Sequence, residues 1–283
     1  MGKTTIEWAT HSWQVSVGCS EPRGAQACAR CYARGIAARF GEVKGHRYEG
    51  VAKFVNGYSR WTGKVEPLRE TLDEPFHWKK PRRVFVDSMA DLFHEFLPFE
   101  YIQEVFEVMA LNPIHTFMVL TKRPERMAQF ADFWREAFPE PARWPANVWA
   151  GTSIGTQKFV EPRMKALLQV PAKVRFLSLE PLLEQLDLSE FYPKLCTTHL
   201  MRLCCGRTPS IHLMIIGGES GRGASSLELD WVRSLIKQAR VMGASPFVKQ
   251  LGSAWAKTNE SVASKGGDMD AWPEDIRVRE IPR

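Results

Sequence analysis

Short apolar segments recur along the chain, and each of them ends in polar or small residues. Valine, isoleucine, phenylalanine and leucine dominate these segments without a strict alternation of apolar and polar positions. This pattern is typical of strands that are buried on both faces of a parallel sheet. The segments are VSVG (15–18), RVFVDSMAD (83–91), FMVLTKR (117–123), VWAGTSI (148–154), VRFLSLEP (174–181), LMIIGGESG (213–221) and PFVKQLG (246–252).

Helical patterns lie between these segments. In the range 99–112, the apolar residues from Ile102 to Met109 recur at the spacing that forms one stripe along a helix. The ranges 124–138, 162–170 and 229–243 repeat the pattern, with Pro124 at a first helical position and Gly243 at a C-terminal cap.

Strands that alternate with helices predict a parallel α/β sheet. Because about seven strands are predicted and the sequence has no nucleotide-binding glycine fingerprint, a full or partial (β/α) barrel is favoured over a doubly wound sheet. We expect the whole chain, 1–283, to form one such domain. The ranges 41–80 and 186–212 are expected to be insertions, and 253–283 an irregular C-terminal tail.

Functional side chains of a (β/α) barrel collect at the C-terminal ends of its strands. Polar residues are expected there in any case, because strand ends meet solvent. The mixed charges of Lys122, Arg123, Glu180 and Lys249 would nevertheless meet on one rim. The residues at the predicted strand ends are Cys19, Asp87, Ser88, Asp91, Thr121, Lys122, Arg123, Thr152, Ser153, Ser178, Glu180, Glu219, Ser220, Lys249 and Gln250.

The amino-acid composition indicates where the protein is located and what kind of partner it binds. Hydrophobic residues make up 44% of the chain and charged residues 25%, as in ordinary soluble proteins. No apolar run approaches the ~18 residues of a membrane span, and the first residues lack the apolar core of a signal peptide. We therefore expect a cytoplasmic protein. Its net charge of +6 suits an anionic partner, nucleic acid included.

The stretch GCSEPRGAQACARCYARG (18–35) contains Cys19, Cys28 and Cys31 in a C-x8-C-x2-C arrangement. In a reducing compartment, clustered cysteines bind metal or carry out redox chemistry more often than they form disulfides. A structural zinc site would need a distant fourth ligand, and simple buried thiols are a further alternative. Three thiolates on a [4Fe–4S] cluster leave one iron without a protein ligand, and that iron can bind a small molecule.

The position of this motif resembles that in radical S-adenosylmethionine (SAM) enzymes, which carry a cysteine loop after the first strand of a partial barrel. Here the motif follows the first predicted strand, 15–18, and precedes a helical run, 34–40. The resemblance implies that Cys19, Cys28 and Cys31 hold a [4Fe–4S] cluster that binds SAM. An external electron donor would then allow SAM cleavage to a 5′-deoxyadenosyl radical, which abstracts hydrogen from a C–H bond. The usual motif is C-x3-C-x2-C, and the eight residues between Cys19 and Cys28 depart from its first gap of three.

A second resemblance extends over nearly the whole chain. The segment IEWATHSWQVSVGCSEPRGAQACARCYARGIAARF is similar to the N-terminus of a phage and bacterial family with a three-cysteine motif that ends in CYA, once described as a domain of unknown function. The blocks VFVDSMADLFHE, VLTKRPERM, NVWAGTSI, RFLSLEPLL, IIGGESG and PFVKQLG resemble its later blocks in order, from about Ile6 to Gly252. This resemblance implies a radical-SAM-like iron–sulfur protein, often phage-encoded, and implies no particular substrate.

The resemblance to radical-SAM enzymes also implies roles for residues at the strand ends. Asp87, Ser88 and Asp91 follow the second segment, where such enzymes place groups that receive the amine of SAM. Lys122 and Arg123 would pair with the SAM carboxylate or with a substrate phosphate. For each of these residues the alternative is a solvated or purely structural role.

Two further groups are weaker candidates. Glu180 would accept hydrogen bonds from ribose hydroxyls, and Gly217, Gly218 and Glu219 would form a close turn in the cofactor or substrate pocket. A second metal could bind in KLCTTHLMRLCCG, although adjacent cysteines rarely ligate one ion, so free or buried thiols are favoured there. That group comprises Cys196, His199, Cys204 and Cys205.

These features predict a radical-SAM enzyme in the cytoplasm, or in the host cytoplasm if a phage encodes it. Basic charge, ten tryptophans and the phage resemblance favour DNA as its substrate. The sharper hypothesis is an isomerase or C–C bond-forming enzyme that hypermodifies a modified thymidine and so evades restriction; a base in duplex DNA would have to be flipped out. The alternatives are a radical-SAM enzyme for a peptide or small molecule, and a zinc- or Fe–S-stabilised nucleic-acid-binding module without catalysis. Delivery of the substrate by a partner protein stays open, and no membrane association is expected.

Overall fold

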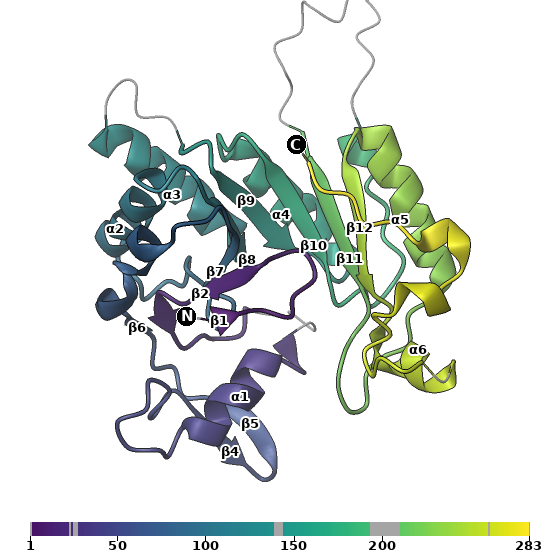
Figure 1. The fold of residues 1–283 in the computed structure, drawn as a ribbon, viewed down its shortest axis with the longest axis horizontal. Helices are drawn as coiled ribbons and strands as arrows, with labels where there is room; N and C mark the ends of the chain where they lie inside the picture. The colour runs from purple at the N-terminus through teal and green to yellow at the C-terminus, as the bar shows by residue number, and fades with distance from the viewer. Residues whose placement is uncertain are drawn as a thin grey trace, which may run out of the picture. The chain divides into compact units, whose positions relative to one another are not determined.

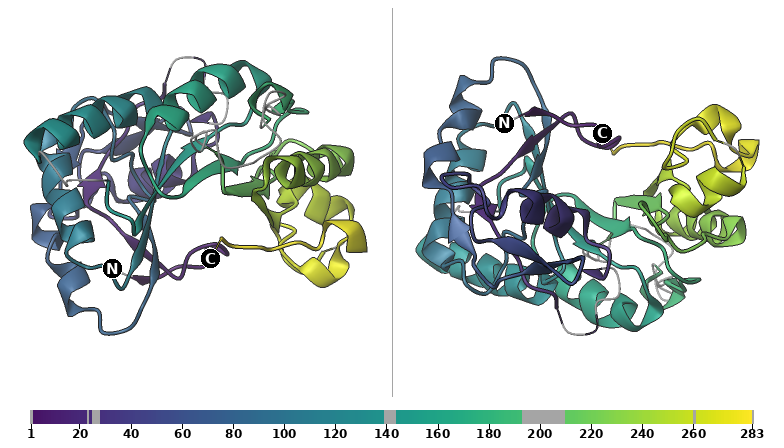
Figure 2. Two further views of the ribbon diagram at one scale, coloured as in Figure 1. Left: turned by 90° about the horizontal axis from the view of Figure 1, so that it is seen from above. Right: turned by 90° about the horizontal axis from the view of Figure 1, so that it is seen from below.

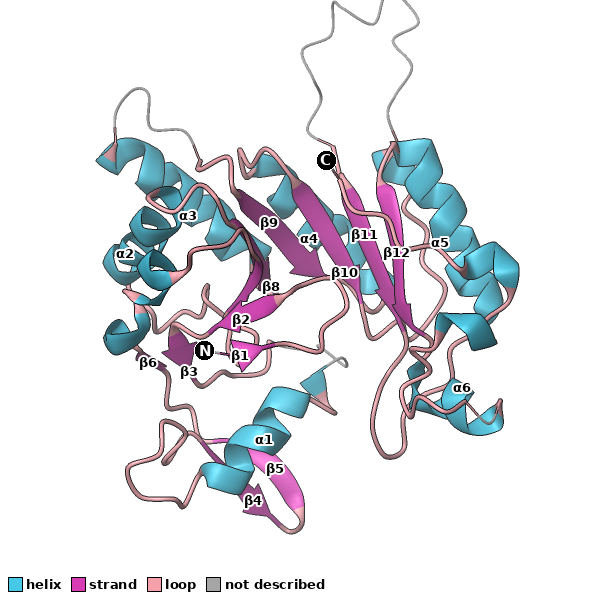
Figure 3. Cartoon of the chain, in the orientation of Figure 1, coloured by secondary structure: helices cyan, strands magenta, loops and turns pink. Residues whose placement is uncertain are grey.

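The computed structural model of the protein describes residues 2–22, 24, 28–138, 144–192, 210–259 and 261–282. The chain divides into two compact units, one comprising Met1–Thr152 and Val170–Lys173 and the other Ser153–Gln169 and Val174–Arg283. Helices and strands alternate in both units (Figures 1 and 3), so the prediction of an α/β fold is confirmed.

The main sheet of the first unit has the strand order β1-β2-β7-β8-β9. Its strands run parallel except at the edge, where β1 pairs antiparallel with β2. Helices α2 and α3 lie along one face of these strands (Figure 2). The elements are β1 (Gly2–Lys3), β2 (His11–Trp13), β7 (Arg83–Val86), α2 (Phe99–Ala110), β8 (Thr116–Thr121), α3 (Pro124–Ala137) and β9 (Val148–Ser153).

Apolar burial explains why these residues form these elements. In β8, Phe117, Met118 and Val119 are all buried, as expected for a strand that is covered on both faces. The stripe predicted on α2, from Ile102 to Met109, is buried as well. Phe106 of this stripe packs against the rings of Phe130, Trp134 and Trp144.

The second unit contains a parallel sheet with the order β10-β11-β12. Helix α5 packs against β11 and β12 through its buried apolar face. Gly243 caps α5 in the left-handed conformation, with φ +71°, as the sequence predicts. The elements are α4 (Val160–Gln169), β10 (Arg175–Leu179), β11 (Leu213–Gly217), α5 (Leu229–Met242), β12 (Ser245–Gln250) and α6 (Gly252–Thr258), with the short 3₁₀ helices η4 (Gln157–Phe159) and η5 (Ser189–Phe191).

A closed barrel is not found among the residues that the structure describes. The strand order within each unit is linear, from β1 to β9 in the first and from β10 to β12 in the second. What the structure provides is therefore an α/β fold with mostly parallel strands. The number of predicted strands did not determine closure, which depends on strand tilt and stagger.

The segment 15–18 does not form a strand of the main sheet, and this part of the prediction was wrong. Instead, β3 (Ser16–Val17) pairs antiparallel with β6 (Glu66–Pro67) in a separate two-stranded sheet. The main-sheet strand before the cysteines is β2. Beyond it, the backbone N–H groups of Val15 and Ser16 donate to the Asp87 carboxylate rather than to a neighbouring strand.

The predicted insertion 41–80 is folded and belongs to the first unit. Within it, β4 (Ala52–Val55) and β5 (Tyr58–Trp61) form an antiparallel hairpin that packs against helix α1 (Tyr32–Phe40). Two short 3₁₀ helices, η2 (Arg69–Thr71) and η3 (Glu74–His77), complete the segment. Of the second predicted insertion, residues 193–209 lie outside the described residues.

The C-terminal tail is more ordered than the sequence suggests. Helix α6 begins it, and two short 3₁₀ helices follow, η6 (Met269–Ala271) and η7 (Glu274–Ile276). Trp272 and Ile276 are buried, and the Arg279 guanidinium donates to the carbonyls of Val248 and Lys249 in β12. In the described parts of both units, no helix is both long and apolar enough to cross a membrane.

Candidate functional site

The three cysteines of the N-terminal motif lie between β3 and α1. All three are free thiols; Cys28 is buried, and Cys19 and Cys31 are partly buried. The Cys31 N–H donates to the Cys28 carbonyl at 3.3 Å, and Cys31 is the N-cap residue of α1. The C-x2-C pair is thus one tight turn at the N-terminus of a helix.

Cys19 lies beside a partly buried cation, Arg123. The Nη1 atom of Arg123 is 4.0 Å from the Cys19 sulfur. The pKa of the Cys19 thiol is raised to about 12, chiefly by burial and also by the Asp91 carboxylate, while the charge of Arg123 opposes both effects. The thiol is therefore protonated in the metal-free chain, and ligation of a metal by Cys19 would release that proton.

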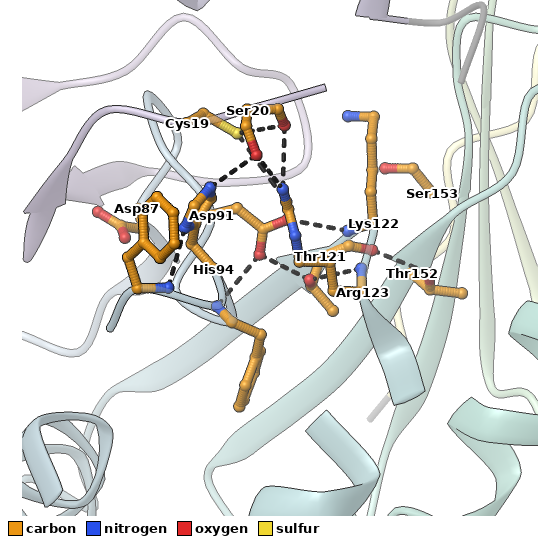
Figure 4. A network of polar contacts seen from close by, with 12 residues as sticks. Cys19, Ser20, Asp87, Asp91, His94, Thr121, Lys122, Arg123, Thr152 and Ser153 are labelled. Carbon is orange, nitrogen blue, oxygen red and sulfur yellow. Dashed lines mark hydrogen bonds and ion pairs between the residues drawn. The ribbon is translucent and has the colours of Figure 1, made fainter. Parts of the chain in front are cut away.

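Arg123 joins the cysteine loop to the ends of two parallel strands (Figure 4). Its Nη1 donates to Asp91 Oδ2 at 2.9 Å, and its Nη2 donates to the carbonyl and hydroxyl oxygens of Ser20 at 3.0 and 2.9 Å. Asp91 also accepts a hydrogen bond from Thr121 Oγ1 at 2.6 Å. Although burial alone lowers the pKa of Arg123, the Asp91 carboxylate raises it above its ordinary value, so the guanidinium stays charged.

His94 extends this network on the side of Ser20. Its Nε2 lies 2.8 Å from Ser20 Oγ, and its Nδ1 accepts a hydrogen bond from the Phe96 N–H at 3.2 Å. Because Nδ1 is an acceptor, the proton is on Nε2, which donates to Ser20. Burial, followed by the charge of Arg123, lowers the pKa of His94, so the ring is neutral. Neither Ser20 nor His94 is among the residues predicted from the sequence.

Asp87 and Ser88 make contacts that hold neighbouring segments of the chain together. Both oxygens of the buried Asp87 carboxylate are engaged, because Oδ1 accepts from the N–H groups of Val15 and Ser16 and Oδ2 accepts from the Ser16 hydroxyl. The Ser88 hydroxyl donates to Gln14 Oε1 at 3.1 Å, and its carbonyl accepts from the Tyr32 hydroxyl. These contacts tie the β2–β3 segment and the start of α1 to the end of β7.

The buried Asp87 carboxyl is expected to make stability depend on pH. Burial raises its pKa from 3.8 to about 7, although the three hydrogen bonds from Ser16 and Val15 lower it. The folded chain therefore retains a proton that the unfolded chain loses between pH ~4 and ~7, so this contribution to the free energy of unfolding falls by about 4 kcal/mol over that interval and is constant above it.

The variant Asp87→Asn should remove most of this slope, because the amide cannot ionise while its oxygen still accepts the two backbone N–H groups. Urea titrations of both proteins at pH 4.5, 5.5, 6.5 and 7.5 would measure the effect, with pH values chosen to bracket the shift. Equal slopes in the two proteins would show that Asp87 is ionised throughout.

Lys122 differs from Arg123 in that its side chain leaves the network. Its backbone N–H donates to Asp91 Oδ2 at 3.3 Å, and the side chain extends away from Asp91 (Figure 4). The ammonium makes no hydrogen bond or ion pair with any residue in the described ranges. Lys122 is thus a partly buried cation, and its charge lowers the pKa of the Cys19 thiol.

The second unit contains its own polar cluster where its three strands end. Lys249 Nζ lies 2.7 and 2.9 Å from the two Glu180 carboxylate oxygens, and Gln250 Nε2 donates to Glu180 at 3.1 Å and to the Gly218 carbonyl at 2.5 Å. A Cβ at Gly217 would be 3.2 Å from the Glu180 side chain, and one at Gly218 only 2.6 Å from the Leu251 carbonyl oxygen. Because neither glycine has a side chain, the backbone at Gly217 can lie close to Glu180 and the backbone at Gly218 close to Leu251.

Glu219 is oriented differently from Glu180. It is buried, and its Oε2 accepts a hydrogen bond from the Ser225 N–H at 2.8 Å. Its carbonyl accepts from the Ser253 N–H at 2.9 Å. Glu219 thus braces the loop after β11 against the start of α6.

Within each unit, the structure brings some of the predicted residues together. In the first unit, Cys19, Asp91 and Arg123 share one network. In the second unit, Glu180 meets Lys249 and approaches Gly217. The second cysteine group, Cys196, His199, Cys204 and Cys205, lies outside the described residues.

The donor set of the cysteine loop fits an iron–sulfur cluster. Soft thiolates are the ligands of such clusters, and three of them come from one loop with a helix N-terminus and an arginine nearby. Across the ranges that the structure covers, no three or more His, Cys, Asp or Glu side chains are already arranged around a metal position. The loop would therefore have to draw its thiols together on binding.

Comparison with known proteins gives a family but no activity. Residues 3–274 match the family model described as a protein of unknown function, DUF5131. This span includes residues 6–252, over which the sequence resembles the phage and bacterial three-cysteine family. No significant match was found among curated proteins or among solved structures. Because the match covers nearly all of the sequence, the chain belongs to DUF5131, a family of proteins of unknown function.

Proposed function

We propose that the protein is a radical-SAM enzyme in which Cys19, Cys28 and Cys31 hold a [4Fe–4S] cluster. The supporting observation is the loop itself, with three free thiols between a short strand and a helix, the first of them beside the partly buried Arg123. With an electron from an external donor, the bound cluster and SAM supply a 5′-deoxyadenosyl radical for abstraction of hydrogen from a C–H bond.

Within this proposal, the chain's own residues position the loop and bind SAM. Arg123 holds the loop through Ser20, and Asp91 neutralises its buried charge, so Arg123 is a positioning residue. Lys122 is the better candidate to bind the SAM carboxylate, because its ammonium has no partner among the residues that the structure describes. Asp87 keeps the strand ends in register and leaves the SAM amine to other groups.

The polar cluster of the second unit has a separate role in the proposal. Glu180 would accept hydrogen bonds from ribose hydroxyls while Lys249 contacts both of its carboxylate oxygens. Gly217 and Gly218 leave space beside that carboxylate because any side chain there would crowd Glu180 or Leu251. This cluster would bind a ribose-containing group.

We propose DNA as the substrate, with the reaction an isomerisation or C–C bond formation on a modified thymidine. The net charge of +6 supports an anionic substrate. A peptide or small-molecule substrate is the alternative for a radical-SAM enzyme. A zinc- or Fe–S-stabilised nucleic-acid-binding module is the alternative without catalysis.

Release of 5′-deoxyadenosine tests the reaction class. Anaerobically reconstituted protein with dithionite and SAM is expected to release it, and a thymidine-hypermodified DNA should increase the rate. Lys122→Met should raise KM for SAM about tenfold with a smaller change in kcat, since a charge-assisted hydrogen bond contributes about 1.5–3 kcal/mol. Product analysis by chromatography and mass spectrometry would measure both.

The matched control is Lys79→Met, which removes an exposed lysine before β7, at the end opposite the cysteine loop. Its KM should equal that of the parent protein. A colourless protein with stoichiometric zinc would reject the proposal, and so would an intact iron–sulfur cluster that never cleaves SAM with any substrate supplied.

A further inference from the structure

The β4–β5 hairpin has two faces of different character. The strands pair in the register Ala52↔Trp61, Lys53↔Arg60, Phe54↔Ser59 and Val55↔Tyr58. Side chains alternate between the faces of a strand, so alternate pairs share a face. The pairs that include Ala52 and Ser59 face helix α1, because Ala52 is buried and Ser59 Oγ accepts from the Arg34 Nε at 3.2 Å.

The opposite face of the hairpin is open. It carries Lys53 directly across from Arg60, and Val55 directly across from Tyr58. All four residues are exposed, and Tyr58 is 72% exposed. Two cations and an aromatic ring therefore form one solvent-facing surface, which we call the open hairpin face.

The two positive charges on the open hairpin face destabilise the hairpin when no ligand is bound. Like charges placed directly opposite each other on antiparallel strands destabilise the pairing. Neither Lys53 nor Arg60 forms an ion pair with an acidic residue in the part of the chain that the structure describes. An anionic ligand bound across the two strands would relieve this repulsion.

The surroundings of the hairpin are also strongly basic. Residues 28–64 contain eight Lys or Arg and two Asp or Glu, a net charge of +6. The whole chain has 38 Lys or Arg and 32 Asp or Glu, so the remainder carries 30 of each and is balanced. The net positive charge of the protein is thus concentrated in α1 and the hairpin region.

The turn of the hairpin holds the aromatic ring in place. Asn56 and Gly57 have φ values of +51° and +79°, the backbone of a two-residue type I′ turn. This turn keeps Val55 and Tyr58 paired at the tip. Aromatic rings presented beside cations are the surface on which single-stranded nucleic acids stack their bases.

We propose that the open hairpin face binds a DNA strand, with Lys53 and Arg60 contacting phosphates and Tyr58 stacking on an unpaired base. Phosphates suit the row of cations, and the base reaches the neighbouring row that contains Tyr58. The choice of DNA over another nucleic acid rests on the proposed function. Acidic proteins and anionic membranes are alternative ligands, and the test below distinguishes them from DNA.

The open hairpin face belongs to the same part of the first unit as the cysteine loop. The Arg34 guanidinium that donates to Ser59 in β5 also donates to the Ala29 carbonyl at 2.6 Å and forms an ion pair with Glu21. Ala29 and Glu21 both lie within the loop that carries the three cysteines. A DNA strand on the hairpin is therefore bound by the same subassembly that holds the candidate cluster ligands.

Fluorescence anisotropy of the full-length protein with labelled DNA tests this proposal. The probes are a single strand of about 20 nucleotides and its duplex. The double variant Lys53→Gln/Arg60→Gln is expected to bind the single strand at least about tenfold more weakly and to reduce the slope of log affinity against log salt by about 1.4. Tyr58→Ala should weaken binding about fivefold or more with the slope unchanged.

The matched control is Lys79→Gln/Lys80→Gln, which removes two exposed charges near the amino end of β7. Its affinity should change by less than about threefold, because these lysines belong to neither the hairpin nor helix α1. Equal losses for both double variants would overturn the proposal in favour of diffuse charge attraction. So would undetectable DNA binding, or poly-glutamate or phosphatidylserine vesicles binding as tightly as DNA.

The binding assay also separates this inference from the proposed function. It needs neither SAM nor an electron donor, and substrate-free SAM cleavage by Lys53→Gln/Arg60→Gln should equal that of the parent protein. If the hairpin variants lose DNA binding while no preparation cleaves SAM, the enzymatic proposal fails and the hairpin inference stands. If SAM is cleaved and DNA binding is unaffected by the variants, only the hairpin inference fails.

Discussion

Replacing Cys28 with alanine is expected to remove nearly all iron and sulfide from the anaerobically reconstituted protein. A cluster held by three thiolates has no spare protein ligand, so one lost cysteine leaves too few anchors. Cys28 is the buried member of the motif, in a tight turn with Cys31, which makes replacement by a nearby thiol difficult. Iron and sulfide assays, together with the EPR signal of the reduced protein, would measure the loss.

The control for this prediction is Cys196→Ala, which alters a cysteine outside the motif. It should retain the iron content and EPR signal of the parent protein. Urea unfolding of both variants would show whether the apoproteins are folded, so that a loss of iron is not confused with a loss of structure. Full iron content in folded Cys28→Ala would reject the ligand assignment.

Replacing Asp91 with alanine is expected to destabilise the protein by about 3–5 kcal/mol. The Asp91 and Arg123 side chains are only 7% and 13% exposed, so the substitution leaves a buried guanidinium without its counter-charge. The same change deprives Thr121 and the Lys122 N–H of their acceptor. Urea denaturation at neutral pH would measure the free energy of unfolding.

Two further variants show whether this loss comes from the buried charge. Asp132→Ala breaks an ion pair with Arg135 in which both side chains are more than 60% exposed, and it should cost no more than about 1 kcal/mol. Adding Arg123→Met to Asp91→Ala should recover part of the loss, because it removes the unpaired charge. A cost below 1 kcal/mol for Asp91→Ala would show that water reaches this site in solution.

The sequence predicted the features that follow from short runs or regular repeats of apolar residues. The strands from β7 to β12 lie where continuous apolar segments occur, because a strand covered on both faces needs apolar residues throughout. The buried stripe of α2 and the Gly243 cap of α5 were predicted for the same local reasons. Such local patterns are common to α/β folds, whatever the arrangement of their strands.

Features that depend on contacts between distant residues were not predicted. Ser20 and His94 are 74 positions apart, and no spacing in the sequence indicates that their side chains meet. The strand at 15–18 was placed in the wrong sheet because its backbone N–H groups bond to Asp87, a side-chain contact that leaves no periodic pattern. The ordered tail was missed because Trp272 and Ile276 are isolated apolar residues in a polar segment.

Arg34 has a consequence for how the cysteine motif can vary in length. Its one guanidinium contacts Glu21, two positions after Cys19, and the Ala29 carbonyl, one position after Cys28. Both ends of the long first gap are thus fastened to the same side chain of α1. Since closing a longer loop costs only about 0.6 kcal/mol for each doubling, insertions or deletions between these two anchors should be tolerated while the anchors remain. The separation of the first two cysteines in space is then set by Arg34, and the eight-residue gap need not match the shorter spacing of other three-cysteine loops.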